Sequence, residues 1–109
     1  MSDKWRPISF NELYDQIIWT EQKLMGELDN TWRLIRIAPE KWKMDDLGAI
    51  EEFWVIAVFG NNVIWYNDIE DGFTIGDFAQ FGNLLPNTDG QHHLIDLIHL
   101  IWGKIKYLP

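Results

Sequence analysis

Two groups of side chains in this sequence have types and spacings that could carry chemistry. The first is the acidic stretch 67–71, which reads NDIED and contains Asp68, Glu70 and Asp71. In a strand, Asp68 and Glu70 would point to the same side, so they could form a carboxylate pair for acid–base work. A calcium loop is excluded because Ile69 stands at the third loop position, where an oxygen ligand is required. The favoured interpretation is a turn, with Asp71 and the glycine after it in the tight positions.

The second group is His92, Asp96 and His99, which would lie on one stripe of a C-terminal helix. This spacing could hold a metal ion if further ligands came from elsewhere in the chain. Combined with Asp68 and Glu70, it defines one candidate function, a small metal-binding protein or hydrolase. The same three residues are also the polar stripe of an otherwise apolar helix. The sequence favours this second interpretation, in which the stripe faces solvent and binds no metal.

Other catalytic groups are missing from the sequence. There is no cysteine, and the only serines, Ser2 and Ser9, lie near the N-terminus without a nucleophile-elbow motif. The GNN sequence at 60–62 lacks the lysine and the Ser/Thr of a phosphate loop. We therefore predict no catalytic residues, no metal and no cofactor, and we favour a binding protein over an enzyme.

The distribution of charge indicates the kind of partner. The net charge is -8, and all nine lysines and arginines lie within 4–43 or 104–106, while residues 44–103 carry ten carboxylates. Nucleic acid is a poor partner for such a surface, because phosphate contacts need cations. A basic protein is the better prediction, although the carboxylates could also serve solubility alone. No signal peptide and no apolar run of roughly 20 residues is recognised, which predicts a cytoplasmic protein without membrane contact.

Two stretches have the periodicity of amphipathic helices, residues 10–28 and residues 92–106. In the first, Glu21 interrupts the apolar stripe, and we expect it to pair with Arg33 or Arg36. Trp19 projects from the polar face of the same helix, where it could anchor a partner or cover a loop. Each helix is expected to begin at a capping box, formed by Ser9 with Glu12 and by Thr88 with Gln91.

The segment between these helices contains the strand signals. Residues 31–37 are predicted as a strand that ends before Pro39, and residues 39–52 as a loop. Residues 53–67 predict a hairpin around Gly60, whose first strand is apolar on both faces and hence central. Residues 73–82 fit either a third strand or a short helix.

This order of elements predicts a single α+β domain over residues 1–109. Its antiparallel sheet would have three to five strands, flanked by an N-terminal and a C-terminal helix. The predicted core consists of residues on the inward stripes of helix, strand and helix: Phe10, Leu13, Ile17, Leu24, Val55, Ala57, Leu97 and Ile101.

Residues 53–82, FWVIAVFGNNVIWYNDIEDGFTIGDFAQFG, contain the core Trp-Tyr-Asn-Asp-Ile-Glu-x-Gly-Phe. In this core the chain resembles a group of small, mostly uncharacterised bacterial proteins. Some of these resemble cytoplasmic immunity proteins that neutralise bacterial toxins. The resemblance covers about half of the chain and implies no catalytic residue, because its motif is tied to no established chemistry.

Together these observations predict an acidic protein-binding module. Its sharpest form, which depends on the resemblance, is an immunity protein that binds a basic toxin domain. The predicted partner-binding residues are Trp65, Asp68, Glu70 and Asp71, with Trp65 as an exposed aromatic beside the acidic turn. A third candidate is a self-associating structural module, a homodimer that would bury Leu97, Leu100 or Trp102 of the apolar C-terminal helix.

Overall fold

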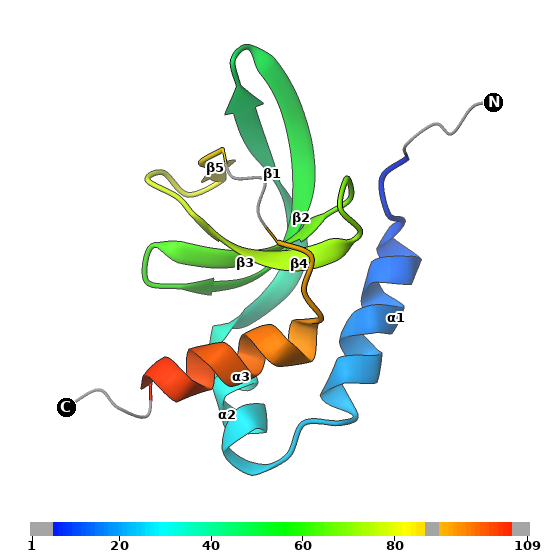
Figure 1. Cartoon of the computed structure of the whole chain (residues 1–109), viewed down its shortest axis with the longest axis vertical. Coiled ribbons are helices and arrows are strands. Elements are labelled where there is room, and N and C mark those ends of the chain that lie inside the picture. The colour runs from blue at the N-terminus through cyan, green and yellow to red at the C-terminus, as the bar shows by residue number, and fades with distance from the viewer. Residues whose placement is uncertain (1–5, 87–89, 106–109) are drawn as a thin grey trace.

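The computed structural model describes residues 6–86 and 90–105, which form an α+β fold with three helices and a five-stranded sheet (Figure 1). This confirms the predicted fold class. The described part of the chain contains no helix with the length and apolar character needed to cross a membrane. The elements in chain order are α1 (Phe10–Glu21), α2 (Gly26–Ile35), β1 (Arg36–Asp46), β2 (Ala49–Phe59), β3 (Asn62–Asn67), β4 (Gly72–Asp77), β5 (Asn83–Leu84) and α3 (Leu94–Ile105).

The sheet has the strand order β4-β3-β2-β1-β5. Strands β1 to β4 form a meander in which every neighbouring pair is antiparallel. The short β5 returns beside β1 and pairs with it in parallel, at Lys43 and Met44. The sheet is therefore mixed and curled, which differs from the purely antiparallel sheet that the sequence predicts. The β1–β2 hairpin extends beyond the rest of the sheet as an arm, away from α2 and α3 (Figure 1).

The predicted helix over 10–28 is wrong in length, because it is two helices. Helix α1 begins at the predicted capping box, where Ser9 Oγ accepts the N–H of Glu12 and Glu12 Oε1 accepts the N–H of Ser9. It ends at Glu21, and α2 begins at Gly26, whose φ of +60° interrupts a continuous helix. Leu24 lies between the two helices and is buried, as predicted.

The predicted strand over 31–37 is also wrong, because α2 continues to Ile35. Thr31, Trp32 and Ile35 are buried, and their spacing places them on one side of a helix. Burial of this face outweighs the β propensity of the TWRLIRI sequence. The predicted loop over 39–52 is instead the β1–β2 hairpin. Pro39 lies within β1, where the register with β2 is irregular, so its missing N–H is tolerated.

Two features explain why 39–52 forms a hairpin. Trp42 and Met44 are buried, and the charged residues around them are exposed, which is the alternation of a half-covered strand. At the tip, Leu47 and Gly48 both have positive φ, as a two-residue hairpin turn requires. The predicted hairpin over 53–67 is confirmed as β2 and β3, and the ambiguous stretch after it contains strand β4.

The hydrophobic core consists of two clusters, one on each face of the sheet. The larger includes Leu13, Trp32, Ile56 and Ile98 and joins the helices to the sheet. The smaller lies inside the curl of the sheet, and its buried members are Trp42, Met44, Phe53, Val55, Val63, Trp65 and Leu84. Two covered faces account for the uninterrupted apolar sequence of β2, as predicted.

Seven of the eight predicted core residues are buried, and Phe10 is the exception. It is 45% exposed in the first turn of α1, where its ring lies against Tyr14 and Trp54.

The C-terminal helix begins at Leu94, two residues later than predicted. Thr88 of the expected second capping box and the predicted helix end at 106 lie outside the described residues.

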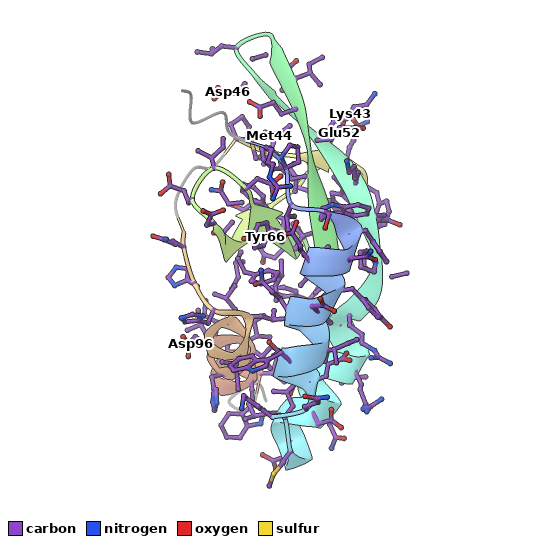
Figure 2. The ribbon with its side chains drawn as sticks, turned by 90° about the vertical axis from the view of Figure 1, so that its right-hand side faces the viewer. Lys43, Met44, Asp46, Glu52, Tyr66 and Asp96 are labelled. Atoms are coloured by element: carbon purple, nitrogen blue, oxygen red, sulfur yellow. The ribbon has the colours of Figure 1, made fainter. Side chains whose placement is uncertain are left out.

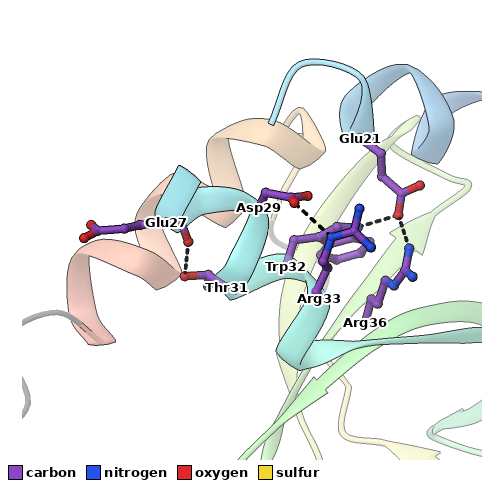
Figure 3. A network of polar contacts seen from close by, with 7 residues as sticks. All are labelled: Glu21, Glu27, Asp29, Thr31, Trp32, Arg33 and Arg36. Carbon is purple, nitrogen blue, oxygen red and sulfur yellow. Dashed lines mark hydrogen bonds and ion pairs between the residues drawn. The ribbon is translucent and has the colours of Figure 1, made fainter. Parts of the chain in front are cut away.

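A polar network joins the end of α1 to α2 and β1 (Figure 3). Glu21 Oε2 accepts the Trp32 Nε1–H at 2.7 Å and pairs with Arg36 Nη1 at 2.7 Å. The expected partner of Glu21 is thus confirmed as Arg36, whereas Arg33 pairs with Asp29. The network explains how a carboxylate is tolerated in the apolar stripe of α1.

Candidate functional site

The acidic stretch forms the turn between β3 and β4, as predicted. Asn67 is buried, and its side-chain Oδ1 accepts the N–H groups of Ile69 at 3.0 Å and Glu70 at 3.2 Å. Asp71 has a φ of +56°, which aspartate tolerates better than most residues. Gly72 has no positive φ. Its missing Cβ instead allows the Gln91 backbone to pass, since a Cβ there would lie 2.7 Å from Gln91 Cα.

The turn separates the predicted binding residues into two classes. Glu70 and Asp71 are exposed, but Asp68 is only 4% exposed and Trp65 only 1%. The expectation that Trp65 is an exposed aromatic is therefore wrong. Trp65 packs inside the curl of the sheet, on Phe53, because both faces of β3 are covered.

Two adjoining cavities lie along α1 and meet at this turn. The first, of about 620 Å³, lies between α1, the turn and the residues before α3. The second, of about 380 Å³, lies between the start of α1 and the turn. Gln16, Tyr66 and Asp71 line both cavities, so we treat them as one feature, the α1 groove. Tyr66, labelled in Figure 2, belongs to β3 and lines the groove together with Gln16 of α1.

The lining of the α1 groove combines carboxylates with aromatic rings. Its larger cavity contains Asp15 and Asp71 beside Trp19, Tyr66 and Phe73. Its smaller cavity contains Glu12, Asp68 and Asp71, and a single cation, Arg6. Carboxylates next to aromatic faces suit a ligand with a positive charge.

Asp68 has the least usual environment in the groove. Burial raises the pKa of its carboxyl from 3.8 to about 6; the Ile8 backbone N–H and Lys41 oppose this rise, and Asp71 and Glu51 add to it. Its Oδ1 is shielded from solvent and has no hydrogen-bond partner within residues 6–86 and 90–105. A buried carboxylate oxygen without a partner is costly, so its presence needs an explanation.

Tyr66 and Gln16 form the centre of the groove. Burial raises the pKa of the Tyr66 hydroxyl, while a hydrogen bond with the Gln16 side chain opposes the rise. The hydroxyl is therefore protonated at neutral pH. At this position it cannot act as a base, but it can donate or accept a hydrogen bond.

The acidic surface continues from the groove to the β1–β2 arm. A small cavity of about 60 Å³ at the base of the arm is lined by Asp46 and Glu51 together with Asn67 and Ile69 of the turn region. Ile69 also lines the α1 groove, so the two surfaces are adjacent. Figure 2 labels Asp46 and Glu52 on the β1–β2 arm.

The predicted stripe of His92, Asp96 and His99 is wrong in its first member. His92 is not in α3: its backbone is extended and pairs with Phe73 through two N–H···O bonds of 2.9 and 3.0 Å. Asp96 and His99 lie on α3, and all three side chains face solvent, as expected. Within residues 6–86 and 90–105, no three His, Asp or Glu side chains gather into a metal-ligand set, so the metal-binding alternative gains no support.

The apolar surface of α3 is largely used within the chain. Leu97 is buried in the larger core cluster, whereas Leu100 is about half exposed. A homodimer interface on this helix therefore cannot include Leu97 without unpacking the core. The self-association hypothesis loses one of its three named residues in this way.

Sequence reasoning missed the contribution of α1 to the site. Glu12, Asp15 and Gln16 occupy the polar side of an amphipathic helix, a pattern typical of any solvent-facing surface. Trp19 was the one available signal: it is 54% exposed, as predicted, and Lys23 Nζ lies 4.5 Å from its ring centroid.

Comparison with protein-family models, curated proteins and solved structures found no match to this chain.

Proposed function

We propose that this chain is an acidic protein-binding module, and that the α1 groove and the β3–β4 turn bind a basic region of another protein. The observation that carries this proposal is the contiguous clustering of carboxylates. Six line the groove and the adjoining base of the arm, against one arginine: Glu12, Asp15, Asp46, Glu51, Asp68 and Asp71.

The clustering favours a basic partner for two reasons. Carboxylates gathered on one surface attract a positively charged protein over a distance and accelerate its association. Trp19 adds a large, half-exposed ring at one end of the groove, of the kind that anchors protein interfaces. Glu70 and Asp71 are exposed on the β3–β4 turn, beside the groove, and would meet the partner first.

The resemblance of residues 53–82 suggests a narrower form of the proposal. In this form the chain is a bacterial, cytoplasmic immunity protein, and its partner is the basic domain of a toxin. Glu70 and Asp71 would then serve binding and not catalysis, and the acidic surface would cover basic residues of the toxin.

The test is affinity capture from source cells with the tagged chain, followed by binding measurements with the purified captured protein. The groove variant combines Glu70→Lys with Asp71→Asn, since asparagine tolerates the positive φ at 71. Glu27→Lys, on the exposed surface of α2 and absent from the groove lining, is the control.

We expect the wild type and the control to capture the same basic protein and the groove variant to lose it. Binding by the wild type should weaken from about 50 mM to about 300 mM salt, as screening of exposed charges requires. Capture of that protein by the groove variant with unchanged affinity and salt dependence would contradict the proposal.

A further inference from the structure

We propose that the α1 groove binds an extended basic peptide segment, one lysine or arginine side chain of which enters the smaller cavity beside Asp68. This inference rests on the proposed function and names the recognition element of the same site. It is carried by the buried carboxylate of Asp68, whose Oδ1 has no hydrogen-bond partner among the described residues, together with the cavity that this residue lines.

The described residues leave the charge of Asp68 without an ion-pair partner. The ion pairs among them are Arg33 with Asp29 and Arg36 with Glu21, and neither includes Asp68. Lys41 is close enough to influence the carboxyl but forms no ion pair with it. A buried carboxylate in this state destabilises the fold, and a cation brought in by a partner would compensate that cost.

The cavity beside Asp68 has the composition that a cationic side chain needs. Glu12 and Asp71 add two more carboxylates, so that three carboxylates face the single guanidinium of Arg6 in this cavity. Gln16 and Tyr66 supply neutral hydrogen-bonding groups. A guanidinium has five N–H donors and an ammonium has three, so either can bond several of these oxygens together. Because Asp68 is only 4% exposed, its attraction for a cation is screened less than that of a surface carboxylate.

A peptide fits the groove better than a metal ion does. No three-ligand set exists in the described residues, whereas the groove continues for a further cavity of about 620 Å³. That cavity offers the rings of Trp19, Tyr66 and Phe73, against which aliphatic stems of basic side chains can pack. The ring of Trp19 already has an ammonium group beside it, that of Lys23.

The test is a titration of the full chain with a peptide of alternating lysine and glycine residues whose termini are blocked. Binding is monitored through the NMR chemical shifts of backbone amides and Trp side chains. The matched probe is the same peptide with every lysine acetylated, which removes the charge and retains the length. We expect shifts at Ile8, Gln16, Trp19 and Asp71 with the charged peptide only.

The variants locate the contact. Asp68→Asn should weaken binding of the charged peptide by about tenfold or more, because it removes the buried charge and retains the shape. Asp71→Asn should also weaken it, and it serves as a second variant if Asp68→Asn perturbs the fold. Asp96→Asn, on α3 and outside the groove, should bind as the wild type does.

Two results would overturn the inference: equal binding by the wild type and Asp68→Asn, or equal binding of the charged and acetylated peptides. Its failure is distinct from failure of the proposed function. If only this inference fails, capture of the cellular protein still depends on Glu70 and Asp71 but is unaffected by Asp68→Asn. If the proposed function fails, the Glu70→Lys/Asp71→Asn variant captures its partner normally.

Discussion

Replacement of Asp68 by asparagine should stabilise the protein at neutral pH and have little effect in acid. The native pKa of this carboxyl is about 6, raised by burial, against 3.8 for an unperturbed aspartate. Below the lower value, both the folded and the unfolded chain carry the proton, so the carboxyl contributes nothing to the pH dependence. As pH rises from 3.8 to about 6, the unfolded chain loses the proton first, and the free energy of unfolding falls.

The size of this effect follows from the same two pKa values. One pKa unit corresponds to about 1.4 kcal/mol, so the shift from 3.8 to about 6 sets an upper limit of about 3 kcal/mol. Water in the adjoining cavity screens part of the penalty, and we expect about 1–2 kcal/mol in practice. The cost is fully present well above pH 6 and absent well below pH 3.8, where both states carry the proton.

The assay is urea unfolding of the wild type and Asp68→Asn at several pH values between about 3 and about 7.5, monitored by tryptophan fluorescence. The asparagine variant should gain stability relative to the wild type as pH rises, by the amount given above. A carbon NMR titration of the Asp68 carboxyl provides an independent measurement. A difference that is constant with pH, or that favours the wild type at neutral pH, would refute the argument that this carboxylate is desolvated and unpaired.

Two further predictions concern the supports of the site. Gly72→Ala should destabilise the chain by about 1–3 kcal/mol in thermal or urea unfolding, because the new Cβ would meet the Gln91 backbone. Gly103→Ala, in open space on α3, should stabilise by about 0.5–1 kcal/mol, and equal effects of the two changes would contradict this reasoning. Glu21→Ala should cost about 1–3 kcal/mol because Trp32 Nε1 loses its acceptor, whereas Glu21→Gln, which keeps an acceptor, should cost less. A loss as large in Glu21→Gln would assign the stabilisation to the ion pair with Arg36 instead.

The parts of the fold that the sequence predicts correctly are those with one dominant local signal. The β2–β3 hairpin has two apolar strands around Gly60, and the start of α1 has a complete capping box. Helix α2 was missed because its β-branched and aromatic residues favour a strand locally, and only burial of Trp32 against the sheet decides the outcome. The β1–β2 arm was missed because charged residues dominate its sequence and obscure the alternation.

The candidate site was predictable in chemistry but not in geometry. The acidic turn, its exposed Glu70 and Asp71, and the exposure of Trp19 all follow from residue type. The burial of Trp65 does not, because a sheet with two covered faces shows no polar alternation by which to orient a strand. The approach of Asp15 to Asp71 depends on how α1 packs, which is a tertiary property.

The edges of the sheet have a consequence for how copies of this chain behave toward one another. β5 covers the outer side of β1 only at Lys43 and Met44, among the residues that the structure describes. An open strand edge is a template for strand addition by another molecule, the first step of aggregation. Here the open part of β1 contains Pro39, which cannot donate a hydrogen bond, and Lys41, whose charge repels an identical strand. The opposite edge, β4, is covered at Phe73 by the His92 backbone and at Asp77 by the Leu85 N–H. The chain can therefore present an extended sheet and a protruding hairpin while both of its edges resist polymerisation.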